Sequence, residues 1–333
     1  MQLKTPYLLF LGDAPDALAA KVAKGIRDWR PQFAVGQLRM DGCQADLGLT
    51  DMTVAEAAAA GAGTLVVGVA NRGGIISDSW VSVLDSALES GMELAAGLHN
   101  RLADVPALAQ KAAQKGLALH DVRHPTQTFS VANGKKRSGK RLLPVGTDCS
   151  CGKMYTALAL EKALLERQRK ATFRATGQTG ILISGAGVSV DAVIADFIAG
   201  AVEWLTPDND DDHWDIIEGQ GSLYHASFAG VTAGLIHGAQ PDALVLCHEP
   251  TRTHMRGLPD YPVPDMEDVM KLSLQMARLT NPKARFAGIS VNTANLDDDA
   301  ADEFLFETGK RFGLPVVDPV RTGVDAIVDQ LDA

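Results

Sequence analysis

Residues 142–164 read LLPVGTDCSCGKMYTALALEKAL, and this stretch decides the fold. An apolar run comes first, a glycine loop follows, and a helix pattern opens at Gly152 and Lys153. In that order the loop offers successive backbone N–H groups, a helix N-terminus and a lysine to one group of anionic oxygens. The sequence therefore predicts a phosphate-binding loop (P-loop) between a strand and a helix; the alternative is a glycine turn without a ligand.

The loop departs from the usual pattern G-x-x-x-x-G-K-[ST] at two positions. Thr147 stands where the first glycine is expected, with Gly146 one place earlier, and Met154 replaces the hydroxyl residue. That hydroxyl normally coordinates the Mg²⁺ of a nucleoside triphosphate, so Mg²⁺ is possible but not expected to be essential. Thr156 is an alternative hydroxyl, two residues farther along. Phosphate binding is assigned to Gly146, Thr147, Asp148, Cys149, Ser150, Gly152, Lys153 and Met154.

Short apolar runs alternate with alanine-rich helical segments along the whole chain, which is typical of βα units around parallel sheets. At 333 residues the chain exceeds what one core usually supports. We predict an α/β protein with an N-terminal Rossmann-like domain and a C-terminal, doubly wound domain like that of P-loop NTPases. A polar stretch without periodicity separates them, so the domains are residues 1–130 and 141–333, joined by a linker at 131–140.

Periodicity and turn residues place the individual elements. Strands are predicted at residues 7–12, 33–38, 64–70, 93–98 and 117–122, and then at 141–145, 171–175, 214–218, 243–247, 286–291 and 315–318. Helices are predicted at residues 16–29, 53–60, 78–89 and 105–115, and then at 153–169, 190–204, 266–279 and 299–312.

Composition argues against several classes of protein. The net charge of −10 disfavours a nucleic-acid partner, because phosphate backbones are bound chiefly by clustered lysine and arginine. The apolar start is only as long as a strand, and the longest later apolar region is interrupted by acidic residues, so neither an export signal nor a membrane span is predicted. We expect a cytoplasmic protein with no membrane partner, without disulfides, and a homodimer on base rates.

Polar residues follow several predicted strands, which is where open parallel sheets bind ligands. Glu218 can accept a proton at one such exit, with a capping role as the alternative. His248 and Arg252 follow another, where histidine can act as a base and arginine can clamp an anion, unless the loop is only a polar surface. Asp191, near a predicted helix start, is either functional or favoured by the helix dipole. The candidate catalytic residues are Glu218, His248 and Asp191.

Two other strand exits offer groups for a small carboxylate substrate. Asn71, Arg72 and Gly73 form one of them, although a tight turn without a ligand explains them equally well. Arg174 and Gln178 form the other. Together with Arg252, these are the candidate substrate-binding residues.

The cysteines of the loop, Cys149 and Cys151, flank Ser150. Their spacing is not a standard zinc motif, so no metal site is predicted and packing under the loop is the simpler interpretation. The helix N-terminus and Lys153 would nonetheless lower a thiol pKa, which leaves a reactive Cys149 open.

The chain resembles a family long described as a domain of unknown function, which includes D-glutamate N-acetyltransferases. The matching stretches span nearly the whole chain: GVANRGG, GTDCSCGKM, ATGQTG, VDAVIADFIAGAVE, EGQGSL and PDALVLCHEPTR. The segments GTDCSCGKM, EGQGSL and GISVN are also similar to the dethiobiotin synthetase class of P-loop proteins.

The resemblance implies transfer of an acetyl group from acetyl-CoA to the amine of D-glutamate, or of a related D-amino acid, in D-amino-acid catabolism. CoA carries a diphosphate and a 3′-phosphate, which a P-loop without its Mg²⁺ hydroxyl can hold without hydrolysis. Glu218 or His248 would then deprotonate the ammonium, and N–H groups at residues 219–221 would stabilise the oxyanion. The alternatives are an ATP- and Mg²⁺-dependent ligase or kinase using Asp148 and Glu218, and a nucleotide-sensing regulator.

Overall fold

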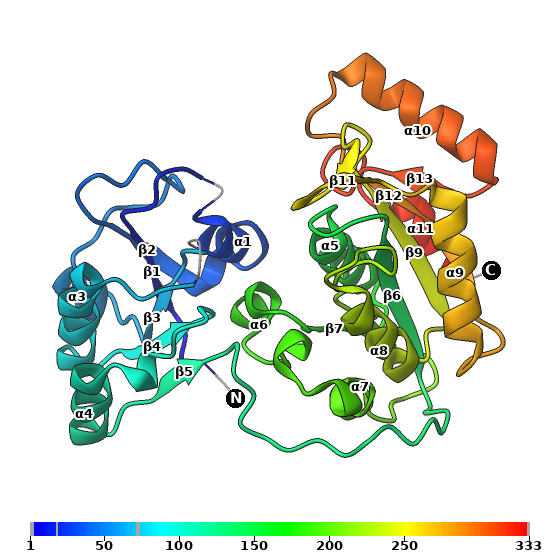
Figure 1. Ribbon diagram of the computed structural model, residues 1–333. Helices are drawn as coiled ribbons and strands as arrows, with labels where there is room; N and C mark the ends of the chain where they lie inside the picture. The colour runs from blue at the N-terminus through cyan, green and yellow to red at the C-terminus, as the bar shows by residue number, and fades with distance from the viewer. Residues whose placement is uncertain (1–2, 18, 71–73, 332–333) are drawn as a thin grey trace. The chain divides into compact units, whose positions relative to one another are not determined.

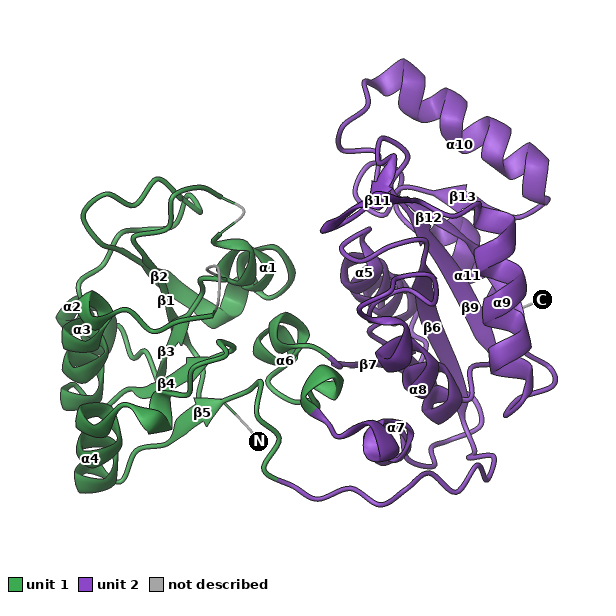
Figure 2. Cartoon of the chain, viewed as in Figure 1, with its two compact units in different colours: residues 1–126, 177–192 green, residues 127–176, 193–333 purple. Residues whose placement is uncertain are grey.

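In the computed structural model, which describes residues 3–17, 19–70 and 74–331, the chain forms two compact units (Figures 1 and 2). Unit 1 comprises Met1–Thr126 and Gly177–Ala192, and unit 2 comprises Gln127–Thr176 and Val193–Ala333. The sequence-based division placed residues 177–192 with the second domain, whereas in the structure they pack with the first.

Unit 1 is built on a five-stranded parallel sheet of order β2-β1-β3-β4-β5. Its strands are β1 (Tyr7–Gly12), β2 (Ala34–Arg39), β3 (Thr64–Val67), β4 (Glu93–Ala96) and β5 (Leu119–Asp121). Its helices are α1 (Lys21–Trp29), α2 (Val54–Ala59), α3 (Asp78–Glu89), α4 (Pro106–Lys115) and α6 (Gln178–Ser184). The strand order reverses between β1 and β3, as in doubly wound folds, because successive crossovers run to opposite sides of β1.

Close packing explains why α6 belongs to unit 1. A Cβ added at Gly25 of α1 would lie 3.1 Å from Cδ1 of Ile183 in α6, so the glycine lets the two helices approach. On the sheet side, Ala23 of α1 contacts the end of β3: a Cβ at Gly68 would lie only 2.3 Å from that of Ala23. Helix α1 is therefore held between β3 and α6.

Unit 2 is built on a six-stranded sheet of order β13-β12-β9-β6-β8-β7, whose neighbouring strands are parallel. Its strands are β6 (Lys140–Gly146), β7 (Ala171–Arg174), β8 (Trp214–Ile217), β9 (Ala243–His248), β12 (Arg285–Val291) and β13 (Val316–Val317). Strand β6 lies between β9 and β8, so the segments that follow these three strands share one edge of the sheet (Figure 1).

The helices of unit 2 are α5 (Lys153–Glu166), α7 (Ile198–Leu205), α8 (Ala229–Ala239), α9 (Met266–Arg278), α10 (Asp298–Phe312) and α11 (Asp325–Leu331). A small hairpin, β10 (His254–Met255) and β11 (Leu258–Pro262), follows β9. The helix predicted at residues 190–204 is wrong in its first half. Two short 3-10 turns, Val190–Ala192 and Ala195–Phe197, precede α7, and most residues in this stretch are exposed, so its apolar side chains are not packed as those of a continuous helix would be.

The predicted α/β class with two parallel sheets is confirmed, and each predicted strand overlaps an observed one. The hairpin, α6, α8 and α11 were not predicted. Among the described residues, no helix combines the length and the apolar character needed to cross a bilayer.

Candidate functional site

The P-loop follows β6 and leads directly into α5. Gly152 caps the helix with a φ of 108°, and Ser150 has a φ of 52°, so the backbone turns sharply twice within three residues. The N–H groups of Ser150, Cys151 and Gly152 donate to no acceptor in the described part of the chain. Such free donors beside a helix N-terminus are what an anion such as phosphate requires.

Lys153 crosses beneath this loop. Its side chain is buried, and Nζ donates to the carbonyl oxygen of Asp148 over 2.7 Å. Two glycines make room for it: a Cβ on Gly146 would lie 3.0 Å from Nζ, and a Cβ on Gly219 would lie 3.0 Å from Cδ. Gly219 follows β8, so the two neighbouring strand ends jointly shape the channel for the lysine.

Asp148 organises the outer side of the loop. Its buried carboxylate accepts hydrogen bonds from the Cys149 N–H, at 2.6 Å, from Nη1 of Arg252, at 2.6 Å, and from the Arg256 N–H, at 2.8 Å. Nη1 of Arg252 also donates to the carbonyl oxygen of Cys149 over 2.6 Å, and its Nη2 to that of Ser150 over 3.4 Å. Arg252, predicted to bind substrate, is thus engaged with the P-loop.

His248 ends β9 on one side of the P-loop. Its Nδ1 lies 3.0 Å from Oγ1 of Thr147, and its ring stacks against Phe304 of α10 with centroids 5.9 Å apart. Burial lowers the pKa of His248 below its ordinary value, and the nearby Glu249 carboxylate only partly opposes this. The imidazole is therefore neutral near pH 7, as a general base requires.

Glu218 follows β8 on the other side of the P-loop. Its buried Oε2 accepts the N–H of Thr176 over 2.9 Å, and its carbonyl oxygen accepts the Thr176 hydroxyl over 2.6 Å. Ser222 then donates to the carbonyl oxygen of Thr147 over 3.2 Å. The ends of β7 and β8 are thereby tied to each other, and the β8 segment to the P-loop.

Thr156 does not replace the missing Mg²⁺ hydroxyl. Its Oγ1 donates to the carbonyl oxygen of Gly152 over 3.1 Å and lies 2.7 Å from Oγ of Ser290, within the core. The position after Lys153 holds the thioether of Met154, which is a poor ligand for a hard cation.

One cluster in unit 2 has potential metal-ligating atoms within 4.8 Å of one another: Asp148, Cys149 and His225. Its donors already have partners. His225 Nε2 lies 3.1 Å from the carbonyl oxygen of Arg256, and its Nδ1 accepts the Ser227 N–H over 3.2 Å. An ion would have to displace this hydrogen-bond network.

The expectation that Cys149 has a lowered pKa is wrong. Burial is the largest influence and raises the pKa of the thiol to about 11, although the charge of Lys153 acts in the opposite direction. The helix N-terminus therefore does not produce a thiolate at neutral pH.

Several predicted residues do not join this site within unit 2. Arg174 pairs with Ile217 in the sheet, but its Nε donates to the buried Asp215, near the start of β8. The guanidinium therefore points away from the strand end that carries the P-loop. Asp191 belongs to unit 1, where its carboxylate forms an ion pair of 2.5 Å with Arg123. Gln178 begins α6, also in unit 1. Asn71, Arg72 and Gly73 lie outside the described residues.

Sequence reasoning missed other residues that the structure places here. Thr176, Ser222 and His225 each follow a strand whose exit was predicted to carry polar groups, but nothing local indicates which partner each side chain takes. Their contacts join residues tens of positions apart, so only the strand order brings them together.

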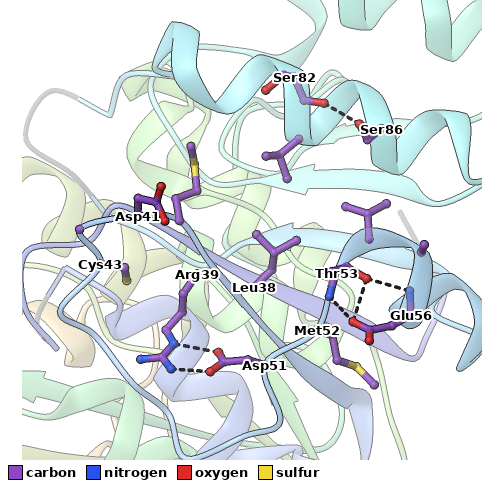
Figure 3. A pocket seen from close by; sticks show the side chains of 15 residues that line it. Leu38, Arg39, Asp41, Cys43, Asp51, Met52, Thr53, Glu56, Ser82 and Ser86 are labelled. Carbon is purple, nitrogen blue, oxygen red and sulfur yellow. Dashed lines mark hydrogen bonds and ion pairs between the residues drawn. The ribbon is translucent and has the colours of Figure 1, made fainter.

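Unit 1 contains a separate open cavity of about 870 Å³ along β2, α2 and α3 (Figure 3). Its polar groups bond to one another: Arg39 to Asp51, and Thr53 to Glu56 in a capping box. The P-loop differs in having backbone donors without partners, and for that reason we assign the anion chemistry to the P-loop.

Comparison with known proteins agrees with the two-part architecture. Residues 38–125 match a family described as a domain of unknown function, the DUF1611_N Rossmann-like domain, and residues 130–328 match the corresponding DUF1611_C P-loop domain. A crystal structure of a DUF1611 family protein from Anabaena variabilis covers 99% of this chain and of its own, with 34% identity and a TM-score of 0.86.

Two relatives are similar over their full length. A protein from Tritonibacter scottomollicae named D-glutamate N-acetyltransferase is 62% identical over 331 residues, covering 99% of both chains. A protein of the same name from a Pseudoalteromonas species is 51% identical over 331 residues, covering 99% of this chain and 100% of its own. With its Rossmann-like and P-loop halves and these full-length relatives, the chain belongs to the DUF1611 family.

Proposed function

We propose that this protein is an N-acetyltransferase that moves the acetyl group of acetyl-CoA to the amine of D-glutamate. The observation that carries the proposal is a P-loop whose backbone donors are free and whose Mg²⁺-binding hydroxyl is replaced by Met154. That combination favours holding a phosphate over cleaving one. The names of the two full-length relatives support the amino acid and the reaction.

The loop suits the phosphates of CoA. Free N–H groups at residues 150–152 provide donors at the N-terminus of α5, and Lys153 provides a positive charge below them. The residues proposed to hold the cofactor are Gly146, Thr147, Asp148, Cys149, Ser150, Gly152, Lys153 and Met154. Among these, Asp148 acts indirectly: its carboxylate has the same sign of charge as a phosphate, and it shapes the loop by accepting hydrogen bonds from Arg252 and from two backbone N–H groups.

Acetyl-CoA supplies an activated thioester, so the protein has to deprotonate an ammonium and stabilise an oxyanion. We assign the first role to His248, whose lowered pKa leaves a neutral imidazole. In the tautomer whose Nδ1–H donates to Thr147 Oγ1, the Nε2 lone pair can take the proton. The freed amine then attacks the thioester carbonyl and the C–N bond forms. The C–S bond breaks, and the departing thiolate takes the proton that the nitrogen loses, so that the products are the amide and the thiol. We assign the second role, stabilisation of the oxyanion, to the N–H groups at residues 219–221.

Purified protein tests this directly when it is incubated with acetyl-CoA and a panel of D- and L-amino acids while free thiol is monitored. A parallel reaction contains ATP and Mg²⁺ and is monitored for ADP. Thiol release that depends on D-glutamate is expected, without ADP formation. ADP without thiol would instead show a ligase or kinase.

The P-loop assignment needs its own variant. Lys153→Ala should weaken CoA binding and activity, whereas Lys162→Ala, on the exposed face of the same helix, should not. Full activity and unchanged CoA affinity in Lys153→Ala would refute the role given to the loop.

A further inference from the structure

The loop after β9 carries two arginines that differ in what their side chains contact. The guanidinium of Arg252 is committed to Asp148 and to two P-loop carbonyl oxygens. The guanidinium of Arg256 is exposed and forms no hydrogen bond or ion pair with any residue that the structure describes. One arginine therefore builds the loop, and the other is available for a ligand.

The main chain of Arg256 is nevertheless fixed to the P-loop. Its N–H donates to Oδ2 of Asp148 over 2.8 Å, and its carbonyl oxygen lies 3.1 Å from Nε2 of His225. Asp148 and His225 are each only 1% exposed, so two buried side chains hold one exposed residue. Buried polar groups of this kind are costly unless paired, which makes the attachment rigid.

The local chain geometry adds to this rigidity. Met255 pairs with Leu258 across the β10–β11 hairpin, so Arg256 and Gly257 are its two turn residues. Gly257 has a φ of 79°, as the third position of a type II turn requires. Arg256 thus occupies the second position of a tight turn.

The charge of Arg256 reaches the loop. Burial raises the pKa of Cys149, and the positive charges of Lys153 and Arg256 are among the influences that act in the opposite direction. A guanidinium that acts on a P-loop residue, and that has no acidic partner among the described residues, is poised to meet an anion there. Its planar fork matches phosphate oxygens.

We infer that Arg256 binds a phosphate group of the ligand held by the P-loop, and that Arg252 is a positioning residue which keeps the loop in shape. The inference rests on the proposed function, because we take the bound phosphate to be a phosphate of CoA. The 3′-phosphate and the diphosphate share the same chemistry, and the ligands used below separate them.

The test measures dissociation constants of CoA, 3′-dephospho-CoA and inorganic pyrophosphate for the wild type and for Arg256→Gln. Loss of one charge-assisted contact should weaken CoA binding about 10- to 100-fold, with kcat at saturation changing much less than KM. Arg256→Lys should recover part of the affinity. A penalty that disappears with 3′-dephospho-CoA assigns the contact to the 3′-phosphate, and a penalty that persists there assigns it to the diphosphate.

Two further variants separate binding from structure. Arg285→Gln, an exposed arginine at the start of β12 bonded to the Gln330 carbonyl, should leave CoA affinity unchanged. Arg252→Gln should lower the melting temperature, because it leaves the buried Asp148 uncompensated, whereas Arg256→Gln should not.

The inference is overturned if Arg256→Gln binds CoA and pyrophosphate as the wild type does. It is also overturned if Arg256→Gln loses affinity only in proportion to a lowered melting temperature. Should the wild type bind pyrophosphate but not CoA, the proposed function fails. The pyrophosphate comparison then still decides the role of Arg256.

Discussion

Thr147 Oγ1 lies 3.0 Å from Nδ1 of His248, so a hydrogen bond joins the first loop residue after β6 to the last residue of β9. The contact aligns the imidazole with the P-loop, and Phe304 supports the ring from α10. An orienting partner of this kind matters because a base must be held within hydrogen-bond reach of the proton it removes.

We expect kcat at saturating substrates to fall on the acid side with a midpoint below pH 6.5. Burial lowers the pKa of His248 from its ordinary 6.5, and protonation below that pKa removes the base. His248→Asn should lower kcat by about 10²- to 10⁴-fold and remove the decline of kcat at acid pH.

Thr147→Val should lower kcat roughly fivefold, because it removes a hydrogen bond to His248 that is worth about 1 kcal/mol. Thiol release across pH 5–9 measures all three, and an acid limb that survives in His248→Asn would exclude His248. His254→Asn, an exposed histidine bonded to Thr253, serves as the control.

Gly219→Ala should impair both stability and cofactor binding. The added Cβ would lie 1.9 Å from the Pro144 carbonyl oxygen and 3.0 Å from Cδ of Lys153, so backbone or lysine has to move. Overpacking of this kind costs about 1–3 kcal/mol. Urea unfolding and CoA titration check it. Gly230→Ala in α8, where a Cβ meets nothing within 4 Å, should be neutral or up to about 1 kcal/mol stabilising. If Gly219→Ala and Gly230→Ala had the same stability and the same affinity for CoA, close packing at Gly219 would not matter for either property.

Asp318→Asn should lower the free energy of unfolding by about 1–3 kcal/mol at pH 7. The buried carboxylate accepts hydrogen bonds from Thr293, Val320 and Arg321. Burial alone would raise its pKa, but these bonds outweigh that and hold the pKa below 3.8. Its stabilising contribution is therefore present above the unfolded pKa and is lost as the pH falls through the folded pKa.

Denaturant unfolding at pH 7 and at pH 3 gives the free energy of unfolding of the wild type and of Asp318→Asn. The difference between the two free energies should be smaller at pH 3. The control is Asp325→Asn, whose exposed ion pair with Arg167 should be worth less than about 1 kcal/mol. If the difference in free energy of unfolding were the same at both pH values, the ionisation of Asp318 would not contribute to stability.

Alkylation of Cys149 should be slow at pH 7.5 and should accelerate about tenfold per pH unit up to about pH 10. The reason is that burial raises its thiol pKa to about 11, whereas the thiolate is the reactive form. Peptide mass spectrometry after iodoacetamide treatment measures the rate. Rapid labelling that levels off below pH 8 would mean a low pKa and would restore the reactive-thiol hypothesis.

The sequence sufficed to predict the sheets and the P-loop because both depend on local patterns. Strands such as β6 and β9 are continuous apolar runs, and the glycine loop has its own spacing. The β10–β11 hairpin was missed because β11 is almost entirely exposed and shows no buried alternation. Arg252 was expected to hold substrate, whereas its bond to Asp148 spans 104 positions and follows only from the order of β6 and β9.

The placement of α6 in unit 1 also limits how the gene can be divided. The chain passes from one unit to the other three times, after Thr126, Thr176 and Ala192. A polypeptide that ends at Thr126 would lack the helix against which Gly25 of α1 packs, and its solubility would suffer from the uncovered surface. A single recombination junction after Thr126 would therefore exchange the whole P-loop unit together with α6, and unit 1 would be assembled from two different parents.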